Sequence, residues 1–155
     1  MLGKTIADLE PGDVFVPLRY ELTSFMCAVY AHGVEETAEC YYSDANPYGR
    51  QLRPPTMVHV DKLRLLEANC DDERRIAGMR AEAARIHYEY AAVHHSPAFV
   101  GEEIVVTGRI TDKYVKRERR YLAYEIRVET ASGRLVTTYE DVTLLDYARV
   151  QEVSA

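Results

Sequence analysis

The chain has 155 residues, 47% of them hydrophobic and 28% charged, which predicts a single domain over residues 1–155 with a real core and argues against a disordered chain. The net charge of -6 argues against a nucleic-acid partner. With no bilayer-long apolar run and no signal-peptide pattern after Met1, we expect a cytoplasmic protein without a membrane partner. Three cysteines without a Cys-x-x-Cys spacing predict neither a disulfide framework nor a metal site.

The first third of the chain predicts a strand, a helix and a loop. Residues 14–20 are typical of a strand, and Thr23 is a suitable N-cap for a helix that Gly33 is expected to end. The stretch 36–55 is polar and rich in turn formers, so it predicts a loop. The residues expected on the apolar face of this first helix, with His32 packed and hydrogen-bonded, are Phe25, Ala28, Val29 and His32.

A second helix is expected to begin at Thr56, which is a natural N-cap. A further helical pattern covers residues 72–86 and starts with acidic residues that suit the positive end of a helix dipole. Whether these are two helices or one broken helix stays open. The apolar positions expected on the buried face of the second helix are Met57, Val60, Leu63 and Leu66.

The remainder of the chain predicts strands. Candidates are residues 87–93, 103–111 and 122–128, the last with strict alternation of apolar and polar residues. Ser132-Gly133 predicts a hairpin turn before a return strand at 134–145. The short connections require antiparallel pairing, so the order of elements predicts an α+β fold in which an antiparallel sheet of about five strands wraps around one central helix.

Three motifs occur in a recognisable order. Asp44-x-Asn46-Pro47 lies in the predicted loop, Arg53-Pro54-Pro55-Thr56-Met57 precedes the second helix, and a longer run includes Ile86-His87, His95-Ser96-Pro97 and Val100-Gly101-Glu102. Together they resemble the MaoC-like hydratase/dehydratase family over roughly residues 6–145. The fold of that family is the hot-dog fold, a sheet wrapped around a central helix, which agrees with the predicted elements.

The resemblance implies a chemistry and a set of site residues. The family adds water reversibly to enoyl thioesters, usually on coenzyme A, and the thioester is the substrate, so no cofactor is expected. Asp44 would act as the base or water ligand, and Asn46 would orient the loop. The residues that the resemblance places around the substrate are Tyr48, Gly49, Pro55, Thr56, Met57 and His87.

One position departs from the family pattern. The family motif is Asp-x-Asn-Pro-x-His, and the position of its histidine is taken by Gly49, which cannot transfer a proton. Three functions therefore remain open: an enoyl-thioester hydratase or 3-hydroxyacyl-thioester dehydratase, a non-catalytic subunit of a heteromeric dehydratase, and an acyl-CoA thioesterase. In each case we expect a homodimer or a heterodimer with a second hot-dog subunit, because an open sheet edge favours pairing.

Several of these residues also have a purely structural interpretation. Asp44 is as well suited to capping its own backbone as to catalysis, and Tyr48 with its neighbours Tyr41 and Tyr42 suits either a subunit interface or the wall of an acyl pocket. His87 is expected to be structural unless it reaches the cleft. The run 117–120 predicts a solvated turn, with coenzyme A phosphate binding as the alternative.

Overall fold

The computed structural model describes residues 3–71 and 86–145. The helical pattern expected over 72–86 therefore lies outside the described residues, except for Ile86, which begins a strand. The strands and α-helices, in chain order, are β1 (Leu18–Glu21), α1 (Ser24–Gly33), α2 (Val58–Asn69), β2 (Ile86–His94), β3 (Glu103–Lys116), β4 (Arg119–Thr130) and β5 (Leu135–Leu144). Short 3-10 helices within the described residues are η1 (Ile6–Asp8), η2 (Glu39–Tyr41) and η3 (Pro55–Met57).

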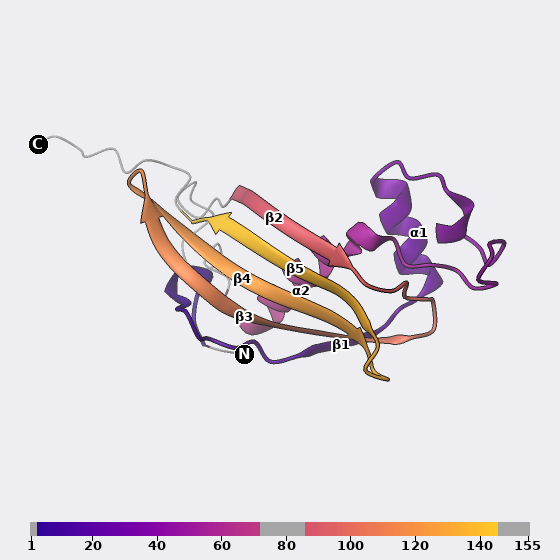
Figure 1. Ribbon diagram of the computed structural model, residues 1–155, viewed down its shortest axis with the longest axis horizontal. Coiled ribbons are helices and arrows are strands. Elements are labelled where there is room, and N and C mark those ends of the chain that lie inside the picture. The colour runs from indigo at the N-terminus through magenta and orange to yellow at the C-terminus, as the bar shows by residue number, and fades with distance from the viewer. Residues whose placement is uncertain (1–2, 72–85, 146–155) are drawn as a thin grey trace, which may run out of the picture.

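The five strands form one antiparallel sheet in the order β1-β3-β4-β5-β2. Figure 1 shows the sheet as a curved layer with α2 along one face, and α1 at the end of the molecule toward which β2 points. The predicted α+β architecture, an antiparallel sheet of five strands around a central helix, is confirmed. The first strand is shorter than expected, because β1 begins only after Pro17, whose missing N–H cannot join a ladder.

The alternation of apolar and polar residues predicted for 122–128 is present in β4. Its apolar side chains on one face are buried, and this face packs toward α2, where Leu65 is fully buried. Each such side chain contributes about 1.5–3 kcal/mol by leaving water. The buried residues of this face of β4 are Leu122, Tyr124, Ile126 and Val128.

Gly108 of β3 sets how closely α2 approaches the sheet. A Cβ placed on Gly108 would lie 2.9 Å from the backbone oxygen of Glu125 and 3.1 Å from the side chains of Leu65 and Phe15. These three groups therefore pack onto bare backbone at this point. A side chain at position 108 would therefore crowd the backbone of β4 and require the Leu65 and Phe15 side chains to give way.

Helix α1 begins as predicted, but it buries a different face. Thr23 accepts a hydrogen bond from the backbone N–H of Met26, which confirms the expected N-cap. The expected apolar face is wrong: Phe25, Val29 and His32 are exposed. The helix instead buries Cys27 and Ala31, because small side chains let it lie close against the domain. The expectation of a packed His32 fails with it.

Helix α2 buries two charges that its hydrophobic pattern does not predict. Asp61 and Lys62 are both buried, whereas Leu63, expected in the core, is 60% exposed. The predicted face is therefore partly wrong, because buried ion pairs replaced apolar contacts. Thr56 is also not the N-cap: it lies inside η3, it is exposed, and the helix follows from Met57 without a side-chain cap.

Strand β2 is an edge strand with a bulge. Its pairing with β5 shifts between His87 and Glu89, so that His87 lies opposite Thr143 and Tyr90 opposite Asp141. In a regular strand, positions 87 and 90 would face opposite sides of the sheet. The bulge brings both side chains to the face that carries α2, and their ring centroids are 5.1 Å apart.

The turn between β3 and β4 is shorter than the predicted run 117–120, because Arg119 and Arg120 already belong to β4. Arg117 and Glu118 are exposed and adopt left-handed φ values of 51° and 60°. This segment is a tight, solvated hairpin turn. No helix among the described residues is long and apolar enough to cross a membrane.

Candidate functional site

The loop that carries the first motif is held in shape by Asn46. Its side-chain oxygen accepts a hydrogen bond from the backbone N–H of Tyr48 at 2.9 Å, and its amide nitrogen donates to the backbone oxygen of Arg50 at 2.8 Å. The Asn side chain thus closes the turn by the same geometry as an Asx-turn. That Asn46 orients the loop in catalysis stays a prediction. These two hydrogen bonds to the loop backbone are how it would do so.

Asp44 lies on the surface of this loop. It is exposed, and no hydrogen bond or ion pair from the described residues reaches its carboxylate. Gly49, which takes the place of the histidine in the family motif, is also exposed. Proton transfer by Asp44 stays a prediction, because Gly49 in this loop gives Asp44 no second acid/base residue.

The motif loop packs onto the turn that precedes β3. The ring of Tyr48 lies 5.6 Å from that of Phe99, and the guanidinium of Arg50 lies over the same ring at 4.4 Å. The backbone N–H of Arg53 donates to Ala98 at 2.9 Å. Two motifs that are far apart in the chain therefore form one continuous surface.

The Pro-Pro-Thr segment borders a groove beside this surface. Pro55 and Thr56 are exposed, whereas Met57 is buried in the core. The groove has a volume of about 270 Å³, and its lining includes Arg53, Pro55, His94, His95 and Pro97. Pro55 thus lies where a ligand in the groove could contact it. Met57 is buried in the core and could only support the groove from the inside. The substrate roles of Tyr48, Gly49, Pro55, Thr56 and Met57 stay predictions.

Arg53 anchors the motif segment to the central helix. Its guanidinium bonds to the carboxylate of Asp61, and both side chains are 1% exposed. Tyr20 of β1 donates to the other carboxylate oxygen at 2.6 Å, and burial beside that charge raises the pKa of Tyr20 above its usual value. Two guanidinium nitrogens of Arg53, Nε and Nη1, have no hydrogen-bond partner among the described residues. The Arg53–Asp61 pair therefore ties β1, the motif segment and α2 together.

A second polar cluster lies around Asp141 of β5 and contacts α2 through Lys62, the residue after Asp61. The Asp141 Oδ2 atom accepts from Lys62 Nζ at 3.0 Å and from the Tyr139 hydroxyl at 2.6 Å. His87 Nε2 lies 2.7 Å from the same oxygen, and Thr143 donates to Oδ1 at 3.0 Å. The carboxylate is completely buried, and the four groups around it come from α2, β2 and β5. We call Asp141, Tyr139, His87, His59 and Lys62 the Asp141 cluster.

Two histidines connect this cluster to its surroundings. The Tyr139 hydroxyl lies 3.1 Å from both His59 Nδ1 and His87 Nε2. The rings of His59 and His87 are 5.3 Å apart, and Tyr90 packs on both at 5.0 and 5.1 Å. The His87 side chain is 34% exposed, so one edge of the buried network reaches the surface. Among the expected substrate residues, His87 alone belongs to this cluster.

The electrostatics of the cluster favour neutral histidines next to an ionised carboxylate. Burial lowers the pKa of His87 below its usual value, although Asp141 acts in the opposite direction. Burial also lowers the pKa of His59, with the nearby His87 and Lys62 adding to it. Burial alone would raise the pKa of Asp141, but the Tyr139 hydrogen bond and the Lys62 charge outweigh it, and the pKa lies below its usual value.

These shifts predict a loss of stability in mild acid. His59, His87 and His94 have lowered pKa values when folded, so the unfolded chain binds more protons as the pH falls through about 6.5. The free energy of unfolding should therefore be lower at pH 5.5 than at pH 7.5, measured by urea denaturation. The stabilising contribution of Asp141 should be lost only as the pH falls below about 3.8, the usual pKa of an aspartate, because the pKa of Asp141 in the folded chain is lower still. An unchanged urea midpoint between the two pH values would contradict this prediction, and the His59→Gln/His87→Gln double variant should reduce the difference.

The loop backbone has room for the histidine that the family motif lacks. Gly49 has a left-handed φ of 61°, and a Cβ placed there meets no atom within 4 Å. We therefore expect Gly49→His to fold, with the free energy of unfolding lowered by about 1–2 kcal/mol through backbone strain alone. Gly49→Ala is the matched control and should cost the same amount in a urea titration. A much larger cost for histidine than for alanine would show that the ring has no room.

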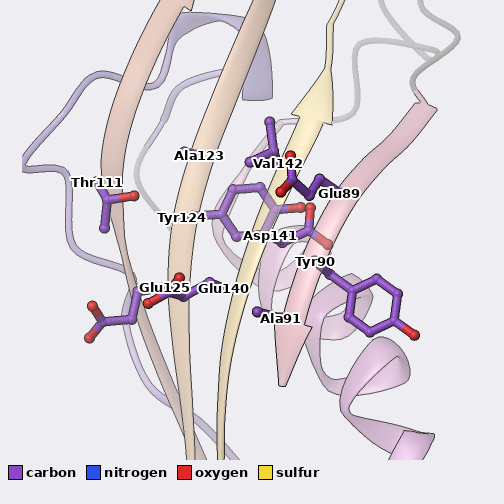
Figure 2. Close-up of a pocket in the computed structure, with 10 residues that line it drawn as sticks. All are labelled: Glu89, Tyr90, Ala91, Thr111, Ala123, Tyr124, Glu125, Glu140, Asp141 and Val142. Atoms are coloured by element: carbon purple, nitrogen blue, oxygen red, sulfur yellow. The ribbon is translucent and has the colours of Figure 1, made fainter. Parts of the chain in front are cut away.

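The outer face of the sheet carries a separate depression of about 260 Å³. Figure 2 shows its lining, with Glu125 and Tyr124, neighbours on β4, pointing to opposite sides of the strand. Glu89, Glu125 and Glu140 supply three carboxylates, and no basic residue lines the depression. It would repel the phosphates of coenzyme A, so it is a poor candidate for the thioester site. No three His, Cys, Asp or Glu side chains within 3–71 and 86–145 are grouped as metal ligands.

Similarity to known proteins now decides the family. The family described as "FAS1-like, dehydratase domain region" matches residues 10–139, which is most of the chain. This chain belongs to that family. It is a MaoC-like protein with the hot-dog fold, as the motifs and the element order predicted. No protein of curated function has a significantly similar sequence.

Solved structures agree on the fold. The HadBC complex, a 3R-hydroxyacyl-ACP dehydratase of Mycobacterium tuberculosis, superposes with a TM-score of 0.70 at 14% identity, covering 86% of this chain and 96% of that one. The (R)-hydratase of A. caviae gives 0.67 at 18% identity, covering 89% and 98%. A MaoC-like dehydratase of Rhodospirillum rubrum gives 0.67 at 14% identity, covering 95% and 100%. This MaoC-like chain therefore shares their fold over nearly its whole length.

Sequence reasoning missed most of the Asp141 cluster. Tyr139 and Asp141 lie in a strand whose alternation of apolar and polar residues is interrupted at these positions. An acidic residue on the buried face of a predicted strand is a signal that a cation or donor must lie opposite. Lys62 on the central helix is that cation.

Proposed function

We propose that this MaoC-like chain binds an acyl thioester and takes part in hydration of enoyl thioesters or dehydration of 3-hydroxyacyl thioesters. The observation that carries the proposal is the single surface formed by the segments 44–57 and 95–102, in which both family motifs meet next to the start of α2. A helix start supplies backbone N–H groups for a thioester oxygen, and exposed loop residues leave room for the carrier. Coenzyme A is the proposed carrier.

A non-catalytic role beside a second hot-dog subunit is the other candidate. Gly49 favours it, as does Asp44, whose carboxylate has no bonding partner among residues 3–71 and 86–145, because the loop alone lacks half of the acid/base pair. The structurally similar HadBC is a complex, which is consistent with a heteromeric partner for this chain. The edge strand β2 offers a place for such a subunit, since Tyr88, Tyr90 and Val93 are exposed along it.

The test is an assay of the purified chain alone and mixed with a hot-dog subunit that carries Asp-x-Asn-Pro-x-His. Hydration of a short enoyl-CoA is followed by loss of the conjugated absorbance, and thiol release from a saturated acyl-CoA is followed separately. Hydration by the chain alone supports the enzyme, and hydration only in the mixture supports the non-catalytic subunit. Thiol release without hydration would replace both by a thioesterase, and an inert chain in every assay would contradict the proposal.

A further inference from the structure

The Asp141 cluster has the composition of an acid/base centre. A carboxylate, a tyrosine and two histidines lie within 2.6–3.1 Å of one another along the chain of contacts Asp141–Tyr139–His59 and Asp141–His87. A buried ion pair between Lys62 and Asp141 would by itself satisfy both charges. The His87 side chain is 34% exposed, so this network of titratable groups is open to solvent at His87.

The hydrogen bonds assign the proton on each ring. An ionised Asp141 can only accept, and the Tyr139 hydroxyl gives its hydrogen to Asp141, so neither group can donate to His87 Nε2. This nitrogen lies 2.7 Å from the carboxylate and 3.1 Å from the Tyr139 oxygen, and it must therefore carry a hydrogen. In the neutral ring this leaves the lone pair on Nδ1, to which no described residue bonds. The Tyr139 hydrogen points to Asp141, so its oxygen accepts from His59 Nδ1. Asp141 thus fixes the tautomer of His87 and leaves a basic nitrogen free.

The cluster lies at the same helix start as the thioester motif. His59 occupies the first turn of α2, directly after the Pro55–Met57 segment, and its ring packs against His87 and Tyr90. The side chain of Tyr90 is 55% exposed beside the two histidines. A substrate bound near the start of α2 would therefore meet His59 and His87 before it met any other titratable group of this cluster.

We propose that His87, oriented by Asp141 and Tyr139, is the general base with which this chain activates water for addition to an enoyl thioester. The inference rests on the proposed function, and it assigns proton transfer to the Asp141 cluster instead of the loop with Gly49. Asp141 and Tyr139 are positioning residues in it.

The proposed step is balanced without a further reactant. His87 Nδ1 takes a proton from water while the water oxygen forms a bond to the β-carbon of the enoyl thioester. The electron pair of the carbon–carbon double bond moves to the α-carbon and is delocalised as the thioester enolate. The imidazolium then returns the same proton to the α-carbon, which yields the 3-hydroxyacyl thioester and neutral His87. A neutral His87 at pH 7 is what burial favours.

The experiment compares wild type, His87→Gln and the control His32→Gln, whose residue is exposed on α1. Hydration of enoyl-CoA and thiol release from saturated acyl-CoA are both measured, with the urea midpoint recorded for each variant. We expect the purified wild-type chain to hydrate enoyl-CoA without a partner subunit, and we expect His32→Gln to have the same kcat/KM. The His87→Gln variant should remain folded but lose about 100-fold or more in kcat/KM.

A pH profile separates positioning from mere stability. The groups facing His87 are Asp141 and Tyr139 of β5, Lys62 and His59 of α2, and Tyr90 of its own strand. Tyr139→Phe removes one donor from Asp141, so the carboxylate attracts the His87 proton more strongly. The acid limb of kcat/KM should then move to higher pH, together with a loss of about tenfold. An unmoved acid limb would mean that Tyr139 does not position the base.

The outcomes distinguish this inference from the function on which it rests. Hydration that is equally fast in His87→Gln and His32→Gln overturns the inference and leaves the function standing. Hydration that appears only with a partner subunit carrying the complete loop motif also overturns the inference and leaves the function standing. Thiol release without hydration overturns both the inference and the hydratase, because water would then not be added to the enoyl double bond. A chain that is inert alone and in the mixture rejects both.

Discussion

Asp141→Ala is expected to lower the free energy of unfolding by about 3–5 kcal/mol, because it leaves Lys62 buried without its counter-charge. The Lys62 side chain is 8% exposed and its ammonium lies 3.0 Å from the Asp141 carboxylate. Tyr139 and Thr143 lose their acceptor in the same variant. Since a domain of this size has about 5–15 kcal/mol of stability in total, the variant should unfold at a much lower urea concentration.

Two comparisons show whether the unpaired charge is the cause. Glu140→Ala changes the exposed neighbour of Asp141 on the same strand and should stay within about 0.5 kcal/mol of wild type. Adding Lys62→Met to Asp141→Ala removes the stranded ammonium and should recover at least about 1 kcal/mol. If the double variant is no more stable than Asp141→Ala, the cost comes from the lost hydrogen bonds and not from Lys62.

Asp61→Ala is expected to have an effect of similar size, about 3–5 kcal/mol. Arg53 is 1% exposed, and two of its guanidinium nitrogens already lack partners among the described residues. Without Asp61 the whole guanidinium would be buried and unpaired, and the Tyr20 hydroxyl would lose its acceptor. Urea denaturation followed by far-UV circular dichroism measures the change.

The control for this second variant lies on the same helix. Glu67→Ala alters an exposed residue of α2 and should change the stability by less than about 0.5 kcal/mol. Arg53→Met combined with Asp61→Leu replaces the pair by apolar groups of similar size and should be more stable than Asp61→Ala alone. A small cost for Asp61→Ala would contradict the prediction and would mean that water reaches Arg53 when the pair is broken.

The two ion pairs explain why the central helix is built as it is. Asp61 and Lys62 are adjacent in sequence but pair in different directions, Asp61 with Arg53 of the motif segment and Lys62 with Asp141 of β5. Opposite charges on neighbouring positions fix the rotation of α2 about its axis, because a turned helix would leave both buried without partners. The same rotation places His59 beside Tyr139. The helix register and the Asp141 cluster therefore depend on each other.

Local signals in the sequence predicted the elements that depend on neighbouring residues alone. The Thr23 cap, the alternation of β4 and the hairpin turn at Gly133 are all present, because each rests on contacts within a few residues. The motif order also predicted the family and the fold. The apolar face of α1 was mistaken, since periodicity locates a stripe of apolar residues but does not decide whether the domain or the solvent meets it.

The sequence alone determined an acidic α+β chain of the MaoC-like family whose loop motif carries Gly49 in place of a histidine. Only the tertiary structure decided which charges are buried and which histidines meet. A bulge in β2 turned His87 toward α2, and the pairing of β2 with β5 brought it to Asp141. The physical reason is that hydrogen bonds between distant segments depend on strand register and helix rotation, and neither is encoded in the spacing of residues along one segment.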